Sequence, residues 1–357
     1  MSGNGAFMFP EQAEAKRLLS AALDEGPAHA YLFHGPSGVG KRAAAREFAG
    51  RLIGESARVA RGAHPDVYEL RALGEMIRID AIRELRRDLH MRPFEADRRV
   101  YLIFDADELN DDAADALLKD LEEPPPYAVV VLVADDLGPI PETIRSRCQL
   151  VPFRRLSERA IRAEVEARAP SLPEAEQLTV ARVAAGRLDR LERLLDERSA
   201  GRRATLLEVA RAVYGDPEFE PSDAAAQLVA SARERGAEAK EREETAIDAL
   251  DLPTREAEQR VRRAQRGAER EELLAALEEL ATWYRDLVVV ASGAESVVMH
   301  ADRLDELRAD ATRERLVGAG EAAEAVRETW RALEEFNLTP SLALEALFVT
   351  LRRELFA

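Results

Sequence analysis

Two short, nearly uninterrupted apolar runs in the first half of the chain limit the folds that it can adopt. They are Val100–Phe104 and Val129–Val133. Continuous apolar runs of this kind are typical of strands buried on both faces, as in a parallel sheet covered by helices. Two further β-like runs, Tyr31–His34 and Val67–Leu70, alternate with helical stretches. We therefore expect an α/β domain with a parallel sheet.

A helix is expected between the two apolar runs, from Asn110 to Glu123. Apolar residues recur in it at spacings of three and four, which makes one face suitable for packing on a core. These residues are Ala114, Leu117, Leu118 and Leu121. The prolines at 124–126 end this helix, because proline has no amide hydrogen to donate.

Length and charge narrow the range of functions. A chain of 357 residues allows two or three domains, and its net charge of −17 argues against a broad nucleic-acid-coating surface. The longest apolar run, Ala128–Ala134, is too short to cross a membrane, and the first residues lack the pattern of a secretion signal. A single cysteine, Cys148, excludes an internal disulfide. These features predict a cytoplasmic protein without a membrane partner.

The second half of the chain is rich in helix-forming residues. Ser157 and Glu158 form a plausible helix start, followed by a small helical unit that runs to about Leu195. A last, all-helical domain follows. Within it, the segment 231–271 is either a long solvated helical hairpin or partly disordered, and helix is favoured. The final helix presents one apolar face, formed by Leu344, Leu347, Phe348, Leu351 and Leu355.

A glycine-rich turn, Gly35–Arg42, follows the first expected strand and opens a helix, which is the context of a phosphate-binding loop. Its glycines, Gly35, Gly38 and Gly40, allow backbone amides to point at phosphate oxygens, and Lys41 would reach the outer phosphates. The next residue should be Ser or Thr to hold Mg²⁺. It is Arg42, which cannot ligate a cation.

The second magnesium ligand should be an aspartate at the end of the strand Val100–Phe104. In active P-loop ATPases of this kind a catalytic glutamate follows that aspartate, and this sequence can be aligned with the pair in two registers. Either Asp105 is the metal-side aspartate and Ala106 replaces a catalytic glutamate, or Phe104 replaces the aspartate and Asp105 takes the glutamate position. Each register removes one required carboxylate, so we expect no hydrolysis of ATP by the isolated chain.

The motifs resemble the delta-prime subunits of bacterial DNA polymerase III clamp loaders, which belong to the AAA+ superfamily. The runs that carry the resemblance are Ile79–Leu85, Arg99–Asp107, Ala116–Pro125 and Ile144–Cys148. His64–Asp66 also resembles that family, and a weaker similarity lies at 337–345, whereas 199–331 carries no matching motif. The family's spacing favours the register with Phe104 in place of the aspartate. The related gamma and tau subunits are active ATPases that keep the magnesium-side residues.

The resemblance implies three domains: an AAA+ nucleotide-binding-like module (1–155), a small helical lid (156–200) and an all-helical collar that joins subunits into a ring (201–357). It implies that Arg147, in the Ser-Arg-Cys run, is an arginine finger that reaches a neighbouring subunit's ATP in trans. The implied partners are gamma/tau-type ATPase subunits, a delta subunit, the sliding clamp and, through the complex, primed DNA. No cofactor is required, and ATP or ADP bound without turnover remains an open alternative.

Many members of that family bind zinc through four cysteines between the phosphate-loop helix and the second strand. Here that region, Leu52–Ala63, has no cysteine, so no zinc and no other metal is expected. No chemistry is assigned to His29, His34, His90 or His300, which show no pairing with acids at ligand spacing. Two other functions stay open: an active AAA+ ATPase motor that uses Asp105 and Asp107, and a non-replicative adaptor that keeps only the fold.

Overall fold

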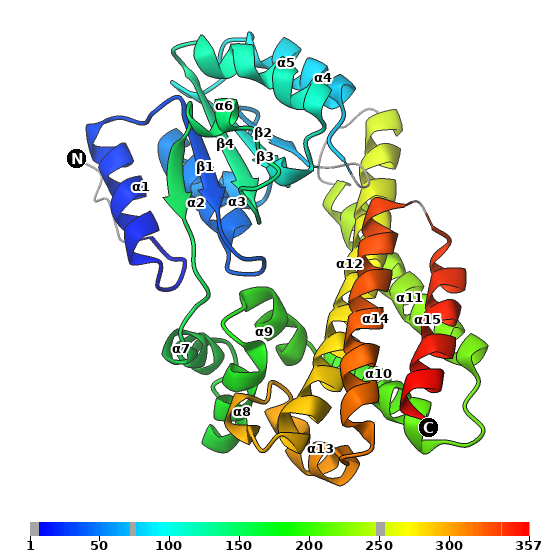
Figure 1. Cartoon of the computed structure of the whole chain (residues 1–357). Coiled ribbons are helices and arrows are strands. Elements are labelled where there is room, and N and C mark those ends of the chain that lie inside the picture. The colour runs from blue at the N-terminus through cyan, green and yellow to red at the C-terminus, as the bar shows by residue number, and fades with distance from the viewer. Residues whose placement is uncertain (1–6, 72–75, 248–253, 337, 357) are drawn as a thin grey trace. The chain divides into compact units, whose positions relative to one another are not determined.

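The structure is a computed structural model and describes residues 7–71, 76–247, 254–336 and 338–356 (Figure 1). By their internal contacts, the residues form two compact units. The first comprises Met1–Pro173 with Ala184–Leu191, and the second comprises Glu174–Val183 with Glu192–Ala357. Among the described residues, none of the helices is long and apolar enough to cross a membrane.

The first unit is built on a five-stranded parallel sheet, as the sequence predicts. Its strands, in spatial order, are β2 (Val67–Leu70), β3 (Arg99–Phe104), β4 (Ala128–Ala134), β1 (Ala30–His34) and β5 (Gln149–Pro152). The edge strand β5 was not predicted. Its residues Gln149 and Leu150 are exposed, so it lacks the apolar pattern of the buried strands.

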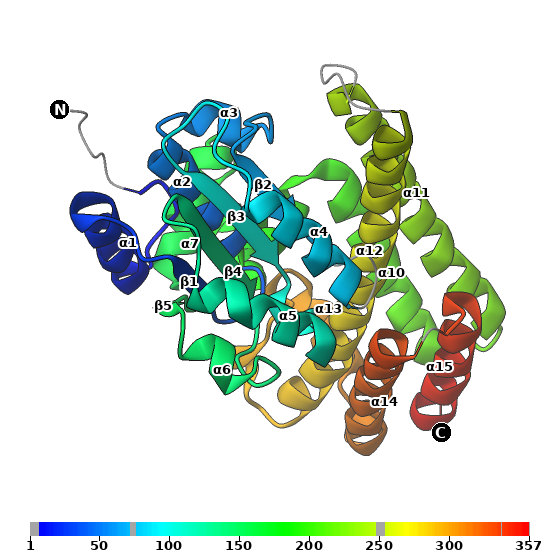
Figure 2. The same ribbon diagram turned by 90° about the horizontal axis from the view of Figure 1, so that it is seen from above.

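Successive residues of the strands point to opposite faces, and helices cover both faces. Val129, Val131 and Val133 of β4 pack in the same core as α1 (Ala13–Glu25), α2 (Lys41–Ile53) and α3 (Ser56–Ala60). Val130 and Leu132 pack in the core that holds α4 (Ile79–Leu89), α5 (Asp111–Glu122) and α6 (Glu142–Arg145). Helices α4 and α5 lie side by side (Figure 2). Every residue of β3 and β4 is buried.

The predicted helix between the apolar runs is confirmed as α5. The Asn110 side chain accepts a hydrogen bond from the Ala113 amide at 3.0 Å, which caps the first turn. Leu117 and Leu121 are buried, and the helix ends at Glu122 before the prolines. A short 3₁₀ turn, η1 (Ala106–Glu108), connects β3 to this helix.

Helix α7 (Glu158–Arg168) begins at the predicted position, since the Ser157 hydroxyl accepts from the Ala160 amide at 3.2 Å. It is followed by α8 (Glu174–Ala184) and α9 (Leu188–Leu195). Of these helices, α7 belongs to the first compact unit and nearly all of α8 belongs to the second. The three-domain division of the sequence stays a prediction, and its boundary at 200–201 falls within α10 (Glu197–Gly215).

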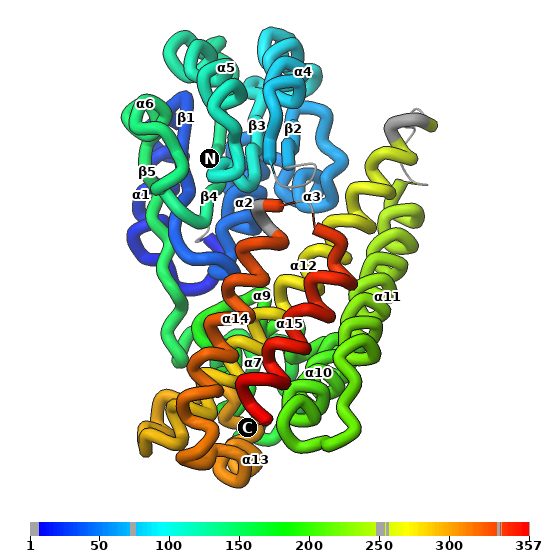
Figure 3. Tube along the Cα trace, turned by 45° about the vertical axis from the view of Figure 1, so that its right-hand side comes forward, coloured from blue at the N-terminus to red at the C-terminus, as the bar shows by residue number. Residues whose placement is uncertain are grey.

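The second unit is a helical bundle. It contains α10, α11 (Pro221–Ile247), α12 (Thr254–Ala291), α13 (Leu304–Asp310), α14 (Arg315–Glu335) and α15 (Pro340–Leu355), with 3₁₀ turns η2 (Glu295–Val297) and η3 (Ala301–Arg303). Helix α12 packs against α11 and α14, and α15 packs against α14 and α11 (Figure 3). The five apolar residues predicted on the last helix are all buried in this core.

The segment 231–271 is helical where it is described. It lies in α11 up to Ile247 and in α12 from Thr254, while residues 248–253 between these two helices lie outside the described residues. The two helices approach closely at Gly236, where an added Cβ would lie 2.4 Å from Cγ of Glu269. The favoured helical interpretation is therefore confirmed for the described part.

A buried ionic network lies in the bundle around His300, to which the sequence assigned no chemistry. The His300 ring bonds Asp286 through Nδ1 (2.9 Å) and Glu279 through Nε2 (2.8 Å), and both His300 and Asp286 are fully buried. Arg285 and Arg203 balance the two carboxylates. Burial alone lowers the pKa of His300, but the hydrogen bonds to the two carboxylates outweigh it and raise the pKa above 6.5.

We expect His300→Gln to destabilise the bundle by about 3 kcal/mol at about pH 6, because it removes the imidazolium that bonds both Asp286 and Glu279. The pKa of His300 is raised by folding, so its charge stabilises the protein below the ordinary pKa, and this contribution is lost as the pH rises through the folded value. Calorimetric melting should thus show a smaller difference from wild type at about pH 9. His29→Gln, at an exposed histidine, is the control. A difference independent of pH would contradict the charged state of His300.

Candidate functional site

The phosphate-loop turn between β1 and α2 has the backbone geometry that its glycines predict. Gly35, Gly38 and Gly40 all have positive φ, at 132°, 76° and 92°. A Cβ at Gly35 would lie 2.1 Å from the carbonyl oxygen of Phe153, at the end of β5. Only glycine therefore fits between the loop and this neighbouring chain segment.

Lys41 is held within its own chain. It is 4% exposed, and its Nζ donates hydrogen bonds to the carbonyl oxygens of Gly35 (2.5 Å) and Pro36 (2.7 Å). An ion pair with Asp135, 2.6 Å away, uses the remaining ammonium hydrogen. Burial lowers the pKa of Lys41, and Asp135 opposes this shift. A phosphate would have to displace Asp135 to pair with Lys41.

A second carboxylate lies directly against the loop, and the sequence analysis missed it. The amide of Leu188 donates to the carbonyl of Gly38 at 2.7 Å, and a Cβ on Gly38 would lie 1.9 Å from Oδ1 of Asp189. Arg187 pairs with Asp189 through Nη2 at 2.6 Å. The loop thus faces an ion pair rather than a free cation, and the carboxylate repels incoming phosphate oxygens.

An arginine follows Lys41, at the sequence position where active P-loop enzymes have a Ser or Thr ligand of Mg²⁺. Arg42 stands in place of the Ser or Thr ligand, pairs with Asp105, and lies over the ring of Phe104, with its Cζ 5.9 Å from the ring centroid. Arg46 and Arg71 also lie against this ring, at 5.0 and 5.3 Å. The residues present do not fit Mg²⁺, because a guanidinium stands where a Ser or Thr oxygen is required. The aspartate position holds either the Phe104 ring, in the register that the resemblance favours, or Asp105, which already pairs with Arg42.

The two aspartates available for a rearranged magnesium site already have partners. Asp105 pairs with Arg42. Asp107 accepts hydrogen bonds from the amides of Asp135 (2.9 Å) and Asp136 (3.1 Å), which fixes the turn after β4. Burial raises the pKa of Asp107 despite these bonds. Both carboxylates therefore contribute to the local structure.

Arg147 follows α6 in a turn at the surface, with its side chain 33% exposed. Its Nη1 donates to the carbonyl of Thr143 (2.8 Å) and to the Ser146 hydroxyl (3.4 Å), and its Nη2 pairs with Glu122 at the end of α5. Burial raises the pKa of the adjacent Cys148 to about 12, as expected for an unreactive thiol. The sequence predicted Arg147 but gave no indication of its contact with Glu122.

A group of possible metal ligands lies near the region where related proteins hold zinc. Ligand atoms of Glu55, His64 and Glu95 lie within 4.8 Å of one another. However, Arg58 Nη1 bridges the two carboxylates, and His64 Nδ1 accepts from the Asp66 amide at 3.1 Å. In a neutral ring the proton is then on Nε2, so this nitrogen has no lone pair for a metal. The donor set therefore does not fit zinc.

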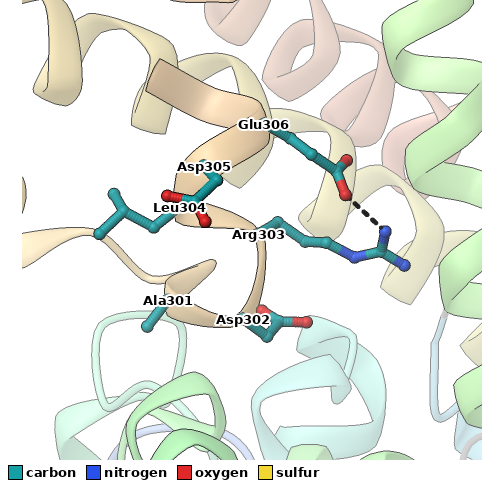
Figure 4. A pocket seen from close by; sticks show the side chains of 6 residues that line it. All are labelled: Ala301, Asp302, Arg303, Leu304, Asp305 and Glu306. Carbon is teal, nitrogen blue, oxygen red and sulfur yellow. Dashed lines mark hydrogen bonds and ion pairs between the residues drawn. The ribbon is translucent and has the colours of Figure 1, made fainter. Parts of the chain in front are cut away.

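A shallow pocket in the second unit is lined by one continuous segment, residues 301–306 (Figure 4). Its charged side chains already have partners within the chain. Arg303 pairs with Glu306 at 2.8 Å, and Asp302 pairs with Arg203 at 2.6 Å. No group in this pocket is left to orient a ligand among the residues that the structure describes, so we do not regard it as a functional site.

In comparisons with known proteins, part of the first unit is similar to subunits of DNA polymerase III. The family described as "DNA polymerase III, delta subunit" matches residues 11–157. The delta' subunit of Bacillus subtilis is 35% identical over 163 residues, which are 42% of this chain and 50% of the relative. The delta' subunit of Pseudomonas aeruginosa is 38% identical over 136 residues, 34% of this chain and 42% of the relative.

The tau subunit of Bacillus subtilis DNA polymerase III is also similar, at 35% identity over 178 residues, which are 46% of this chain and 31% of the relative. The chain thus spans half or less of these relatives' lengths. A gamma subunit-related protein of Thermotoga maritima has a similar fold, with a TM-score of 0.50 and 18% identity, over 96% of this chain and 99% of that one. Residues 11–157 are therefore similar to clamp-loader subunits of the delta' and tau types, and the comparisons support the resemblance over this part of the chain.

We expect Mg²⁺ to add nothing to the binding of ATP by this chain, because Arg42 and Phe104 occupy the positions of the metal's ligands. The change in melting temperature produced by ATP should be the same with Mg²⁺ as with EDTA. The double substitution Arg42→Thr with Phe104→Asp restores oxygen ligands at both positions. If the wild-type chain is stabilised by ATP only when Mg²⁺ is present, this account of the site is wrong.

Proposed function

We propose that this chain is a non-hydrolysing subunit of a DNA polymerase III clamp loader. In this role it supplies Arg147 to the ATP site of a neighbouring subunit, and its helical unit joins the collar of the assembly. The substituted magnesium site is the single observation that carries the proposal. A chain that keeps the phosphate loop but fills the metal position with Arg42 is suited to assist an ATPase rather than to act as one.

Three features of the loop support the absence of turnover. Lys41 is paired with Asp135, the Asp189 carboxylate lies against Gly38, and Arg42 replaces the metal ligand. Asp135 neutralises the charge of Lys41, Asp189 adds a negative charge beside the loop, and Arg42 supplies no oxygen ligand for Mg²⁺. Hydrolysis relies on a metal and positioned cations to stabilise charge in the transition state, and this site lacks that arrangement. ATP or ADP bound without turnover is compatible with the loop.

The exposed position of Arg147 supports a role in trans. A guanidinium remains protonated under all ordinary conditions and binds phosphate oxygens in pairs. Such a group near the γ-phosphate of ATP offsets the negative charge that develops during transfer of the phosphoryl group. The relatives named tau and gamma/tau identify the kind of neighbour, a subunit of the same family that provides the ATP site. The delta subunit, the sliding clamp and primed DNA would be contacted within the assembly.

A second apolar stripe on α15 supports assembly through the helical unit. Leu342 and Val349 of α15, and Phe356 directly after its end, recur at a spacing of seven on the side away from the buried face, and are 66%, 54% and 48% exposed. Apolar residues at this spacing share one side of a helix and pack well against a helix of a partner. We assign this stripe to the contact with a neighbouring subunit of the collar.

We expect Arg147→Ala to slow the ATP site that this chain completes by about 10³-fold or more, the effect of an arginine finger in other NTPases. The measurement is ATP hydrolysis stimulated by clamp and primed DNA, in a complex rebuilt from this chain, a gamma/tau-type ATPase subunit and a delta subunit. Arg159→Ala, at an exposed arginine of α7, is the matched control. An unchanged rate in an intact Arg147→Ala complex would refute the proposed finger.

We expect Leu342→Ser to weaken assembly of the complex about tenfold, since it removes one buried leucine from the interface. The melting temperature of the free chain should not change, because Leu342 is exposed there. Analytical ultracentrifugation of the mixed subunits measures the effect. Val317→Ser, at an exposed valine of α14, is the control. If both variants lose assembly equally, or if neither variant loses it, the α15 stripe is not the interface.

A further inference from the structure

The guanidinium of Arg147 is held on one side by three groups of its own chain. The carbonyl of Thr143 and the hydroxyl of Ser146 accept from Nη1, and the carboxylate of Glu122 pairs with Nη2. These groups come from two elements: Glu122 ends α5, while Thr143 and Ser146 belong to α6 and its cap. The side chain is therefore fixed against the unit although it lies at the surface.

The hydrogen bonds leave one edge of the guanidinium available. A guanidinium has five N–H donors, and the contacts use both hydrogens of Nη1 and one of Nη2. The Nε hydrogen and one hydrogen of Nη2 have no bond to any described residue of the chain. This edge is the pair of donors that binds two oxygens of a phosphate or carboxylate.

We infer that Glu122 is a positioning residue for Arg147, which holds the guanidinium so that its Nε–Nη2 edge is presented to a phosphate of the neighbouring subunit. The inference rests on the proposed function. An arginine has several rotatable bonds and loses conformational entropy when it binds. Glu122 fixes the side chain before the neighbour's phosphate arrives, so less of this entropy is lost in the transition state.

Because Glu122 and Arg147 are both partly exposed, Glu122 can position Arg147 without cancelling the effect of the arginine's positive charge on a phosphate. Glu122 is 49% and Arg147 33% exposed, so water screens the attraction between them. A triphosphate carries more negative charge than one carboxylate, and it would bind the Nε hydrogen and the Nη2 hydrogen that Glu122 does not use. The ion pair and the phosphate contact can therefore exist together, and Glu122 need not dissociate from Arg147.

The test is a double-mutant cycle in the rebuilt complex. Glu122→Gln keeps the length of the side chain and one acceptor oxygen but removes the charge, and Glu122→Ala removes the contact. Glu123→Gln changes the adjacent exposed glutamate and is the matched control. Each substitution is made with Arg147 intact and with Arg147→Ala, and kcat and KM for ATP are measured with clamp and primed DNA present.

We expect Glu122→Gln to lower kcat by about two- to fivefold at the site that this chain completes, the range for an exposed ion pair. Glu122→Ala should lower it further. KM for ATP, assembly of the complex and the melting temperature of the chain should not change. In the Arg147→Ala background neither substitution at Glu122 should have any additional effect, because Glu122 acts only through Arg147.

The outcomes separate this inference from the proposed function. If Arg147→Ala slows the complex but Glu122→Gln and Glu122→Ala do not, the finger stands and the positioning role is refuted. If the Glu122 substitutions slow the Arg147→Ala complex as much as they slow the complex with Arg147 intact, Glu122 acts by another route and the inference is again refuted. If Arg147→Ala leaves the rate unchanged, the proposed function fails and this inference fails with it.

Discussion

Burial of the parallel sheet on both faces determines where the chemical groups of the first unit lie. Helices cover both faces of β3 and β4, so charged groups are found at the ends of these strands and not within them. In a parallel sheet the carboxyl ends of the strands meet at one edge. The phosphate loop after β1, Asp105 after β3 and Asp135 after β4 gather there for this reason, and the ion pairs of Lys41 and Arg42 follow from it.

Arg42 and Phe104 each offset an unfavourable property of the other. A phenylalanine alone would leave an apolar ring beside a phosphate loop, and an arginine alone would leave an unpaired cation. Together, Arg42 lies on the Phe104 ring and pairs with Asp105, so the ring is covered and the charge is neutralised. The phosphate loop is thereby kept as a stable structural element whose partners lie within its own chain.

The sequence predicted the parts of the fold that depend on local periodicity. The apolar runs predicted β3 and β4, the spacing of leucines predicted α5 and the buried face of α15, and glycines at 35, 38 and 40 predicted the phosphate loop. The edge strand β5 was missed because an exposed strand carries no apolar run. The remaining omissions are contacts between separate elements, such as Asp189 with Gly38 and Glu122 with Arg147. The network of His300 was missed for the same reason, since His300 lies in the turn before η3 whereas Asp286 and Glu279 lie on α12.

The central claim is that the chain assists hydrolysis at a neighbour's site and not at its own. The most direct measurement compares two versions of the rebuilt complex that differ in this chain alone, Lys41→Ala and Arg147→Ala, by their ATP hydrolysis with clamp and primed DNA. The account predicts that the Lys41→Ala complex keeps the wild-type rate while the Arg147→Ala complex loses the rate of one site. A loss with Lys41→Ala and none with Arg147→Ala, in intact complexes, would contradict it.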